Sequence, residues 1–281
     1  MILRLSGADF SANNIGKIDI IREITSDTRK LLSNFSREFT DEQMFAVQDF
    51  ISGLKNNGIW SSIGNLYIPV MCGSLSECGY NLKTGEKDVV FGSDYVWSNK
   101  GLKLLPTSTD YLSNAAKVKV NGSQQNLHLG AYNTDSLAGI TQTEAIFGCG
   151  LTDDNKTIIQ FGIAANNAFS LKTDNNTGVR VGSLANADFG KQSLKMVIQS
   201  TLGNFGVIGN FTGEYNPPIS TDHTYTDVPV KVFNIATVWR ETKNYGLLTL
   251  GTAMTREQAS TYSNLCDTLM SKFRKISGNP R

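Results

Sequence analysis

Residues 145–182, AIFGCGLTDDNKTIIQFGIAANNAFSLKTDNNTGVRVG, show the strand pattern of the chain most directly. Within it, two clusters of turn-forming residues, at 152–155 and 174–178, separate short apolar runs. Asn, Asp and Gly suit tight turns, because they tolerate positive φ angles or hydrogen-bond to their own backbone. Short apolar runs between such clusters are typical of β-strands. The stretch therefore predicts a series of short strands joined by tight turns.

The same pattern continues on both sides, between residues 66 and 250. The chain contains 25 Asn and 26 Gly among 281 residues, which favours many changes of direction. The Asn121-Gly122 pair is a further hairpin signal. Because no helical pattern separates the strands, a β-sandwich is predicted rather than a parallel α/β fold. The expected strands are 66–71, 89–91, 118–120, 127–132, 145–148, 157–164, 168–172, 179–182, 194–200, 205–211, 230–239 and 247–250.

Two amphipathic helices are predicted, one before and one after the β region. Thr40 and Gln43 have the spacing of a capping box, and apolar residues at intervals of three and four follow them. A helix is therefore expected near residues 40–57. Thr255 and Gln258 repeat this spacing and predict a second helix near 255–275.

Residues 1–38 are predicted to form an N-terminal arm, separate from a sandwich domain at 39–281. Their apolar residues are interrupted by the polar stretch 11–14 and are too few to form a core of their own. Such an arm must rest on the main domain or on another chain. A short helix is expected between residues 25 and 35. The candidate partner-binding residues of the arm are Ile2, Leu3, Leu5, Phe10 and Ile15.

No catalytic constellation is recognisable, so the chain is predicted not to be an enzyme. The histidines, His128 and His223, have no His or Cys at metal-ligand spacing, so no metal site is predicted from them. Glu144, Glu214 and Glu241 stand alone, whereas glycosidases use paired carboxylates. The four cysteines are expected to be reduced and mostly buried, and no nucleotide-binding fingerprint is present.

Two kinds of ligand site stay open. The loops at 153–155 and 174–176 have a composition that suits Ca²⁺, but turn chemistry explains them equally well, so no cofactor is predicted. Aromatic platforms for a glycan are expected among Tyr95, Trp97 and Tyr132, although packing in the core explains such residues too.

Charge and hydropathy exclude other partners. A formal net charge of +1 gives no global field for nucleic-acid binding. No apolar run approaches the ~20 residues that span a bilayer, so membrane insertion is not expected. The opening residues lack the pattern of a signal peptide, which favours folding in the cytosol.

The ends of the chain resemble virion proteins of tailed phages that carry a concanavalin A-like, laminin-G-like sandwich. The resemblance rests on residues 40–60 with 66–69 and 81–83, and on 248–251 followed by Met254-Thr255 and the helix after them. It implies a jelly-roll β-sandwich flanked by two helices. It also implies a place in a fibre, a decoration or a tail, with other virion proteins as partners, and it brings no catalytic residues to this sequence. The sequence leaves open whether the chain forms a homo-oligomer.

Three functions follow from these observations. The first is a structural and interaction protein of the virion, attached through the arm. The alternative is a carbohydrate-binding, lectin-like module for glycan of the host surface, which is compatible with the first. A glycoside hydrolase is the third, and the absence of carboxylate pairs argues against it.

Overall fold

The computed structural model describes residues 22–105, 116–123, 126–137, 144–148, 160–164, 168–172, 191–200, 203–209, 211–215, 224–236, 239–240 and 243–274. Three α-helices lie in this part of the chain: α1 Ser26–Leu32, α2 Asp41–Asn56 and α3 Arg256–Arg274. The strands and the short 3₁₀ helices η1 and η2 are β1 Ile63–Tyr67, η1 Pro69–Met71, η2 Leu75–Gly79, β2 Tyr80–Asn81, β3 Glu86–Lys87, β4 Tyr95–Ser98, β5 Gly101–Leu104, β6 Lys117–Ser123, β7 Asn126–Asn133, β8 Glu144–Gly148, β9 Gln160–Ala164, β10 Ala168–Lys172, β11 Leu194–Ser200, β12 Gly203–Ile208, β13 Phe211–Tyr215, β14 Thr224–Val232, β15 Asn234–Ala236, β16 Trp239–Arg240 and β17 Tyr245–Gly251.

The helices begin where their capping residues predict. The Thr40 hydroxyl accepts a hydrogen bond from the Gln43 backbone at 3.3 Å, and the Gln43 side chain accepts one from the Thr40 backbone at 3.2 Å. Thr255 and Gln258 make the same reciprocal pair at 3.0 and 3.2 Å. Each box satisfies backbone N–H groups that a helix start otherwise leaves without partners. Both predicted helices are confirmed.

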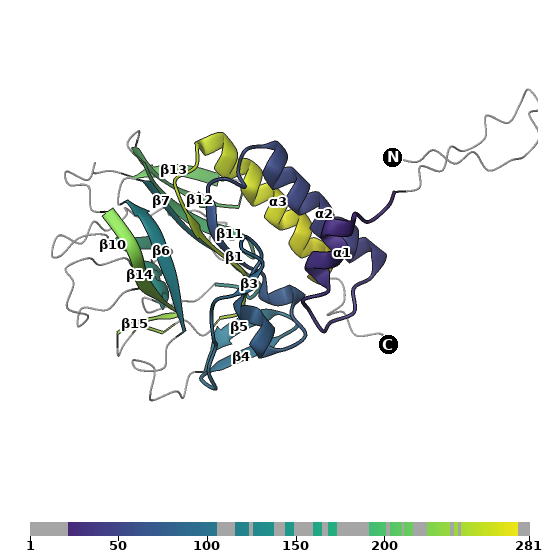
Figure 1. Cartoon of the computed structure of the whole chain (residues 1–281). Coiled ribbons are helices and arrows are strands. Elements are labelled where there is room, and N and C mark those ends of the chain that lie inside the picture. The colour runs from purple at the N-terminus through teal and green to yellow at the C-terminus, as the bar shows by residue number, and fades with distance from the viewer. Residues whose placement is uncertain are drawn as a thin grey trace, which may run out of the picture.

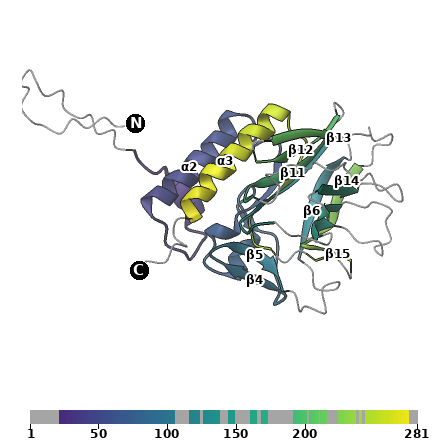
Figure 2. The same cartoon turned by 180° about the vertical axis from the view of Figure 1, so that it is seen from behind.

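The strands form two facing layers, and the helices cover one of them (Figure 1). The first layer has the strand order β10-β9-β8-β14-β6, and the second contains β7-β11-β12-β13 with β17 between β7 and β1. Ser123 pairs with Asn126, so β6 and β7 meet where the chain passes from one layer to the other. The helices α2 and α3 lie side by side on the outer face of the second layer (Figures 1 and 2). The predicted fold class is confirmed: the described chain is mainly β, with a β-sandwich that has one helix before it and one after it.

The central strands of the second layer are buried on both faces. All seven residues of β17 are buried, and β7 is buried from its second residue onward. Tyr132 of β7 reaches α3, where its hydroxyl donates to Asp267 at 2.7 Å. Because side chains alternate along a strand, Leu129 and Ala131 face the other layer. This double coverage explains why residues 245–250 read as a nearly unbroken apolar run.

Several predicted strand boundaries were wrong. The strand expected at 66–71 ends at Tyr67, because Pro69 opens the 3₁₀ helix η1. No strand forms at 89–91. The strand expected at 230–239 is interrupted at Phe233, whose φ of 61° lies in the left-handed region.

Further differences concern the neighbouring segments. The strand expected at 205–211 is divided between β12 and β13, and Asn121-Gly122 lies within β6 instead of forming a turn. The strands β4 and β5 were not predicted. The strand expected at 179–182 and the loops at 153–155 and 174–176 lie outside the described residues.

The segment before α2 belongs to the body of the protein. Leu32 and Phe35 are buried in the main core, and the Phe35 ring meets Tyr80 edge to face. The boundary expected at residue 38 therefore does not separate the described residues into two packing units. The candidate arm residues Ile2, Leu3, Leu5, Phe10 and Ile15 lie outside the described residues. Among the helices of the described part, none is long and apolar enough to cross a membrane.

Candidate functional site

A pocket of about 260 Å³ opens at one end of the second layer, beside the last turns of α3. Five separate segments supply its walls: η1, the β4–β5 turn, the residues after β7, the residue pair before β11, and the end of α3. Its lining residues are Val70, Asn99, Lys100, Thr134, Asp135, Ser136, Gln192, Met270 and Phe273. The polar ones come from loops and the apolar ones from packed elements.

The pairing of β17 brings these loops together. Tyr245 pairs with Leu102 of β5 and with Asn133 of β7, so the turn before β5 and the loop after β7 are neighbours. Gly101 has a φ of 115°, and a Cβ there would collide with the carbonyl oxygen of Tyr245. Only glycine adopts this conformation without strain and allows so close a backbone approach. The glycine thereby places Lys100 at the rim of the pocket.

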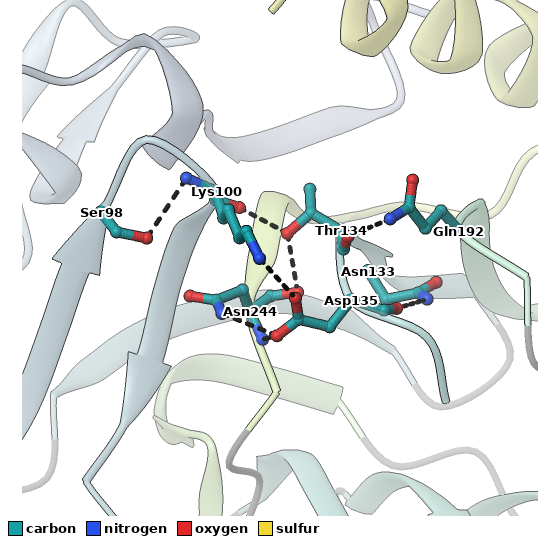
Figure 3. A network of polar contacts seen from close by, with 7 residues as sticks. All are labelled: Ser98, Lys100, Asn133, Thr134, Asp135, Gln192 and Asn244. Carbon is teal, nitrogen blue, oxygen red and sulfur yellow. Dashed lines mark hydrogen bonds and ion pairs between the residues drawn. The ribbon is translucent and has the colours of Figure 1, made fainter. Parts of the chain in front are cut away.

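Asp135 is held as a fixed carboxylate on this rim (Figure 3). Its Oδ2 accepts hydrogen bonds from the backbone N–H of Asn244 at 3.1 Å and from the Asn244 side-chain amide at 2.7 Å. Its Oδ1 lies 3.9 Å from the Nζ of Lys100, which is largely exposed. A surface ion pair at this distance contributes little to stability. It does, however, place a donor beside the fixed Asp135 acceptor.

A buried amide fixes the two loops beneath the rim. Asn133 is fully buried, and its side-chain amide donates to the backbone carbonyls of Asp135 at 2.6 Å and Lys191 at 3.2 Å. Its Oδ1 accepts from the Ser193 backbone at 3.2 Å and from the Nζ of Lys195 at 2.5 Å. Buried polar groups that satisfy one another in this way rigidify their surroundings. The loops on both sides of the pocket are thus tied to one residue.

Thr134 and Gln192 complete the network (Figure 3). The Thr134 hydroxyl contacts the backbone carbonyls of Lys100 and, at 3.1 Å, Asn244. The Gln192 side-chain amide donates to the carbonyl of Thr134, which orients the exposed Gln192 side chain. The rim therefore carries oriented amide, carboxylate and ammonium groups above the apolar side chains of Val70, Met270 and Phe273.

The described lining contains few groups that titrate. Asp135 is the single carboxylate in the described lining, which also lacks histidine and cysteine. Glycosidic hydrolysis by a carboxylate pair would need a second acid about 5–10 Å away. No group of three or more His, Cys, Asp or Glu side chains that could hold a metal occurs among the described residues.

The predicted glycan platforms are placed differently. Tyr95 is buried, and its hydroxyl donates to the Val232 carbonyl at 2.8 Å and accepts from the Ala116 backbone at 3.0 Å. Tyr132 is buried beneath α3. These two rings are core side chains, so they cannot stack on a ligand in this structure. Trp97 is half-buried, and its indole donates to the Pro69 carbonyl at 2.9 Å.

Other candidate groups are structural or lie outside the description. His128 is fully buried in β7. Three of the cysteines are free and buried, as predicted: Cys72, Cys78 and Cys266. His223, Cys149 and Glu241, and the side chains of Glu144 and Glu214, lie outside what the structure describes.

Sequence reasoning missed the pocket residues. The segments Ser98–Gly101 and Asn133–Ser136 are rich in small polar residues, but each alone resembles an ordinary turn. Their proximity depends on the register of β17, which no local pattern encodes.

Comparisons with known proteins find similarity to solved structures, at low sequence identity. No protein-family model matches the chain, and no curated protein matches it. The sialidase of Trypanosoma rangeli overlaps 80% of this chain at 11% identity and a TM-score of 0.47, and the chain spans 39% of that enzyme's length. Domain 4 of the Geobacillus stearothermophilus arabinanase AbnA, solved with arabinotriose, overlaps 72% of this chain and 98% of its own at 12% identity and a TM-score of 0.44. The Ruminococcus gnavus sialidase CBM40, bound to sialyllactose, overlaps 52% of this chain and 84% of its own, at 7% identity and a TM-score of 0.37.

Proposed function

We propose that the chain is a non-catalytic carbohydrate-binding module, with its ligand in the pocket around Asp135. The observation that carries the proposal is the fixed Asp135 carboxylate beside Lys100, above an apolar floor. A sugar presents hydroxyl groups that both donate and accept hydrogen bonds, and C–H faces that pack on apolar side chains. The carboxylate accepts from such hydroxyls and the ammonium donates to them. Because the loops are already fixed, binding requires little ordering of the site.

A glycan array with the purified chain, followed by titration calorimetry with the best ligand, tests this proposal. Asp135→Asn and Lys100→Gln should each weaken binding by about ten- to a hundredfold, since a hydrogen bond to a charged group contributes ~1.5–3 kcal/mol. Asp27→Asn, an exposed acid on α1, is the matched control and should leave the affinity unchanged. The array is run with and without Ca²⁺, so that a metal-dependent ligand is also detected.

Two outcomes would reject the pocket as a glycan site. One is the absence of binding under both conditions. The other is binding that Asp135→Asn leaves unaltered while thermal unfolding shows that the variant is folded.

The role in a virion is a second proposal, compatible with the first. It is supported by the resemblance to phage proteins and by the exposed position of Arg22 and Glu23. Arg22 and Glu23 are exposed, and Arg22 is held on the surface of α2 by Asp49 and the face of Phe45. Arg22 therefore lies at the surface of the body. Deletion of residues 1–21 preserves α1 and the core residue Phe35, which a deletion of 1–38 would remove. The truncated protein should stay folded and fail to co-sediment with assembled particles, and normal incorporation would reject anchoring by the arm.

A further inference from the structure

A second group of polar side chains surrounds Trp60, where the chain leaves α2. Gly58, with a φ of 67°, turns the chain, and Trp60 packs half-buried against the core. The Nζ of Lys83, from the turn between β2 and β3, lies 4.7 Å from the centre of the Trp60 ring. The Nζ of Lys55, on the last turn of α2, lies 5.8 Å from the same centre. Two ammonium groups thus converge on one indole.

These two cations have no carboxylate partner among the described residues. Lys83 donates to the backbone carbonyl of Trp60 at 2.5 Å, which fixes its position but does not neutralise its charge. Burial lowers the pKa of Lys83, and the nearby charge of Lys55 lowers it further. Like charges held close together destabilise a fold unless an anion compensates them. Each ammonium group is attracted to the face of the Trp60 ring, but the two positive charges repel one another, so an anion close to both would be stabilised.

The cluster offers hydrogen-bond donors and an aromatic surface. The Trp60 indole N–H makes no hydrogen bond to any part of the chain that the structure describes. The Trp60 indole N–H and the ammonium groups of Lys55 and Lys83 are all hydrogen-bond donors, and none of these three groups accepts. A neutral sugar needs both kinds of group, as the pocket around Asp135 provides. A donor-only set instead matches the oxygens of an anionic group.

We propose that Lys55, Trp60 and Lys83 form a separate site for a sugar residue that carries a carboxylate or sulfate group. The anionic oxygens lie close to the two ammonium groups, and the indole N–H is a third donor beside them. The site does not depend on the pocket, because none of its residues lines that pocket. The ligand differs from that of the pocket in its charge.

Fluorescence anisotropy with a labelled, heparin-derived disaccharide tests the site, with labelled maltose as the neutral probe. The sulfated probe should bind, with an affinity that falls as salt is raised, and the neutral probe should not respond to changes at this site. Lys55→Gln and Lys83→Gln should each raise the Kd of the sulfated probe about five- to tenfold, and the double variant should abolish binding. Lys30→Gln removes an exposed charge from α1 and is the matched control. Lys55 is exposed on its helix, so its variant tests the site without risk to folding.

Three results would overturn this assignment. The first is an unchanged Kd in the double variant. The second is equal, variant-sensitive binding of the neutral probe. The third is equal and variant-sensitive binding of a labelled oligothymidylate of similar charge, which would make the site one for nucleic-acid phosphate. Asp135→Asn should leave binding of the sulfated probe intact, so failure of the pocket proposal and failure of this one are distinguishable.

Discussion

Acidification should destabilise the fold through His128, the buried histidine of β7. Its Nδ1 lies 2.6 Å from the Thr252 carbonyl and its Nε2 lies 3.1 Å from the Thr249 hydroxyl. A carbonyl oxygen can only accept, so Nδ1 carries the proton and Nε2 accepts from the hydroxyl. The neutral ring is therefore fully satisfied. Burial lowers its pKa from 6.5 to about 4, and the hydrogen bond to Thr252 opposes this shift in part.

The sign and size of the effect follow from this shift. Between the folded and unfolded pKa values, the unfolded chain binds the proton that the folded chain excludes. The free energy of unfolding is thus unaffected above the unfolded pKa of 6.5 and declines as the pH falls toward about 4. At ~1.4 kcal/mol per pKa unit, the loss between about pH 7 and pH 4 is roughly 3 kcal/mol. Most of it is present by about pH 4.5.

Urea unfolding at a series of pH values measures this loss. His128→Asn keeps a side-chain amide near the position of Nδ1 but has no group that titrates in this range. The variant should be less stable than the parent at neutral pH, and its further loss on acidification should be smaller by roughly 3 kcal/mol. Carboxylates contribute equally to both proteins, so the difference isolates the histidine. If both proteins lose the same stability on acidification, the argument from burial is refuted.

Three further predictions concern the helix start, the rim turn and the thiols. Thr40→Ala removes half of a capping box and should lower the free energy of unfolding by about 1 kcal/mol in urea titrations. The m-value, the dependence of that free energy on urea concentration, should not change. Gly101→Ala should cost about 2 kcal/mol or more by the same assay, while Gly92→Ala, which meets no atom within 4 Å and has no positive φ, should be nearly neutral. The hydrogen bond with Cys78 and burial raise the pKa of Cys72, and burial raises the pKa of Cys266. Neither thiol should therefore react with a disulfide reagent at about pH 8 until the protein is unfolded.

The sequence predicted the helices well because their signals are local. A capping box occupies four residues, and the apolar face that follows is visible at once. The strands β10 and β11 were predicted with their exact bounds, since turn-forming residues flank them. The segment 89–91 failed for a non-local reason. Val89 and Phe91 are buried in the core while Val90 is exposed, but the segment pairs with no strand, so burial was mistaken for pairing.

The candidate site could not be predicted for a related reason. Lys100 and Asp135 become neighbours only because Tyr245 pairs with strands on both sides. Tyr95 and Tyr132 show the converse error. Their rings are buried and their hydroxyl groups donate to Val232 and Asp267, so side chains that composition suggests as exposed platforms are part of the core.

The two proposed sites are related through α3. Gln258, at its start, donates to the Gly58 carbonyl at 3.4 Å, next to the cluster around Trp60. Met270, near its end, lines the pocket. At 1.5 Å per residue, these two positions are roughly 18 Å apart along the helix axis. One extended acidic glycan that reached both sites would bind more tightly than either site alone, because the second contact would form within a single complex. Short probes address the sites separately, and a dependence of affinity on chain length would reveal their joint use.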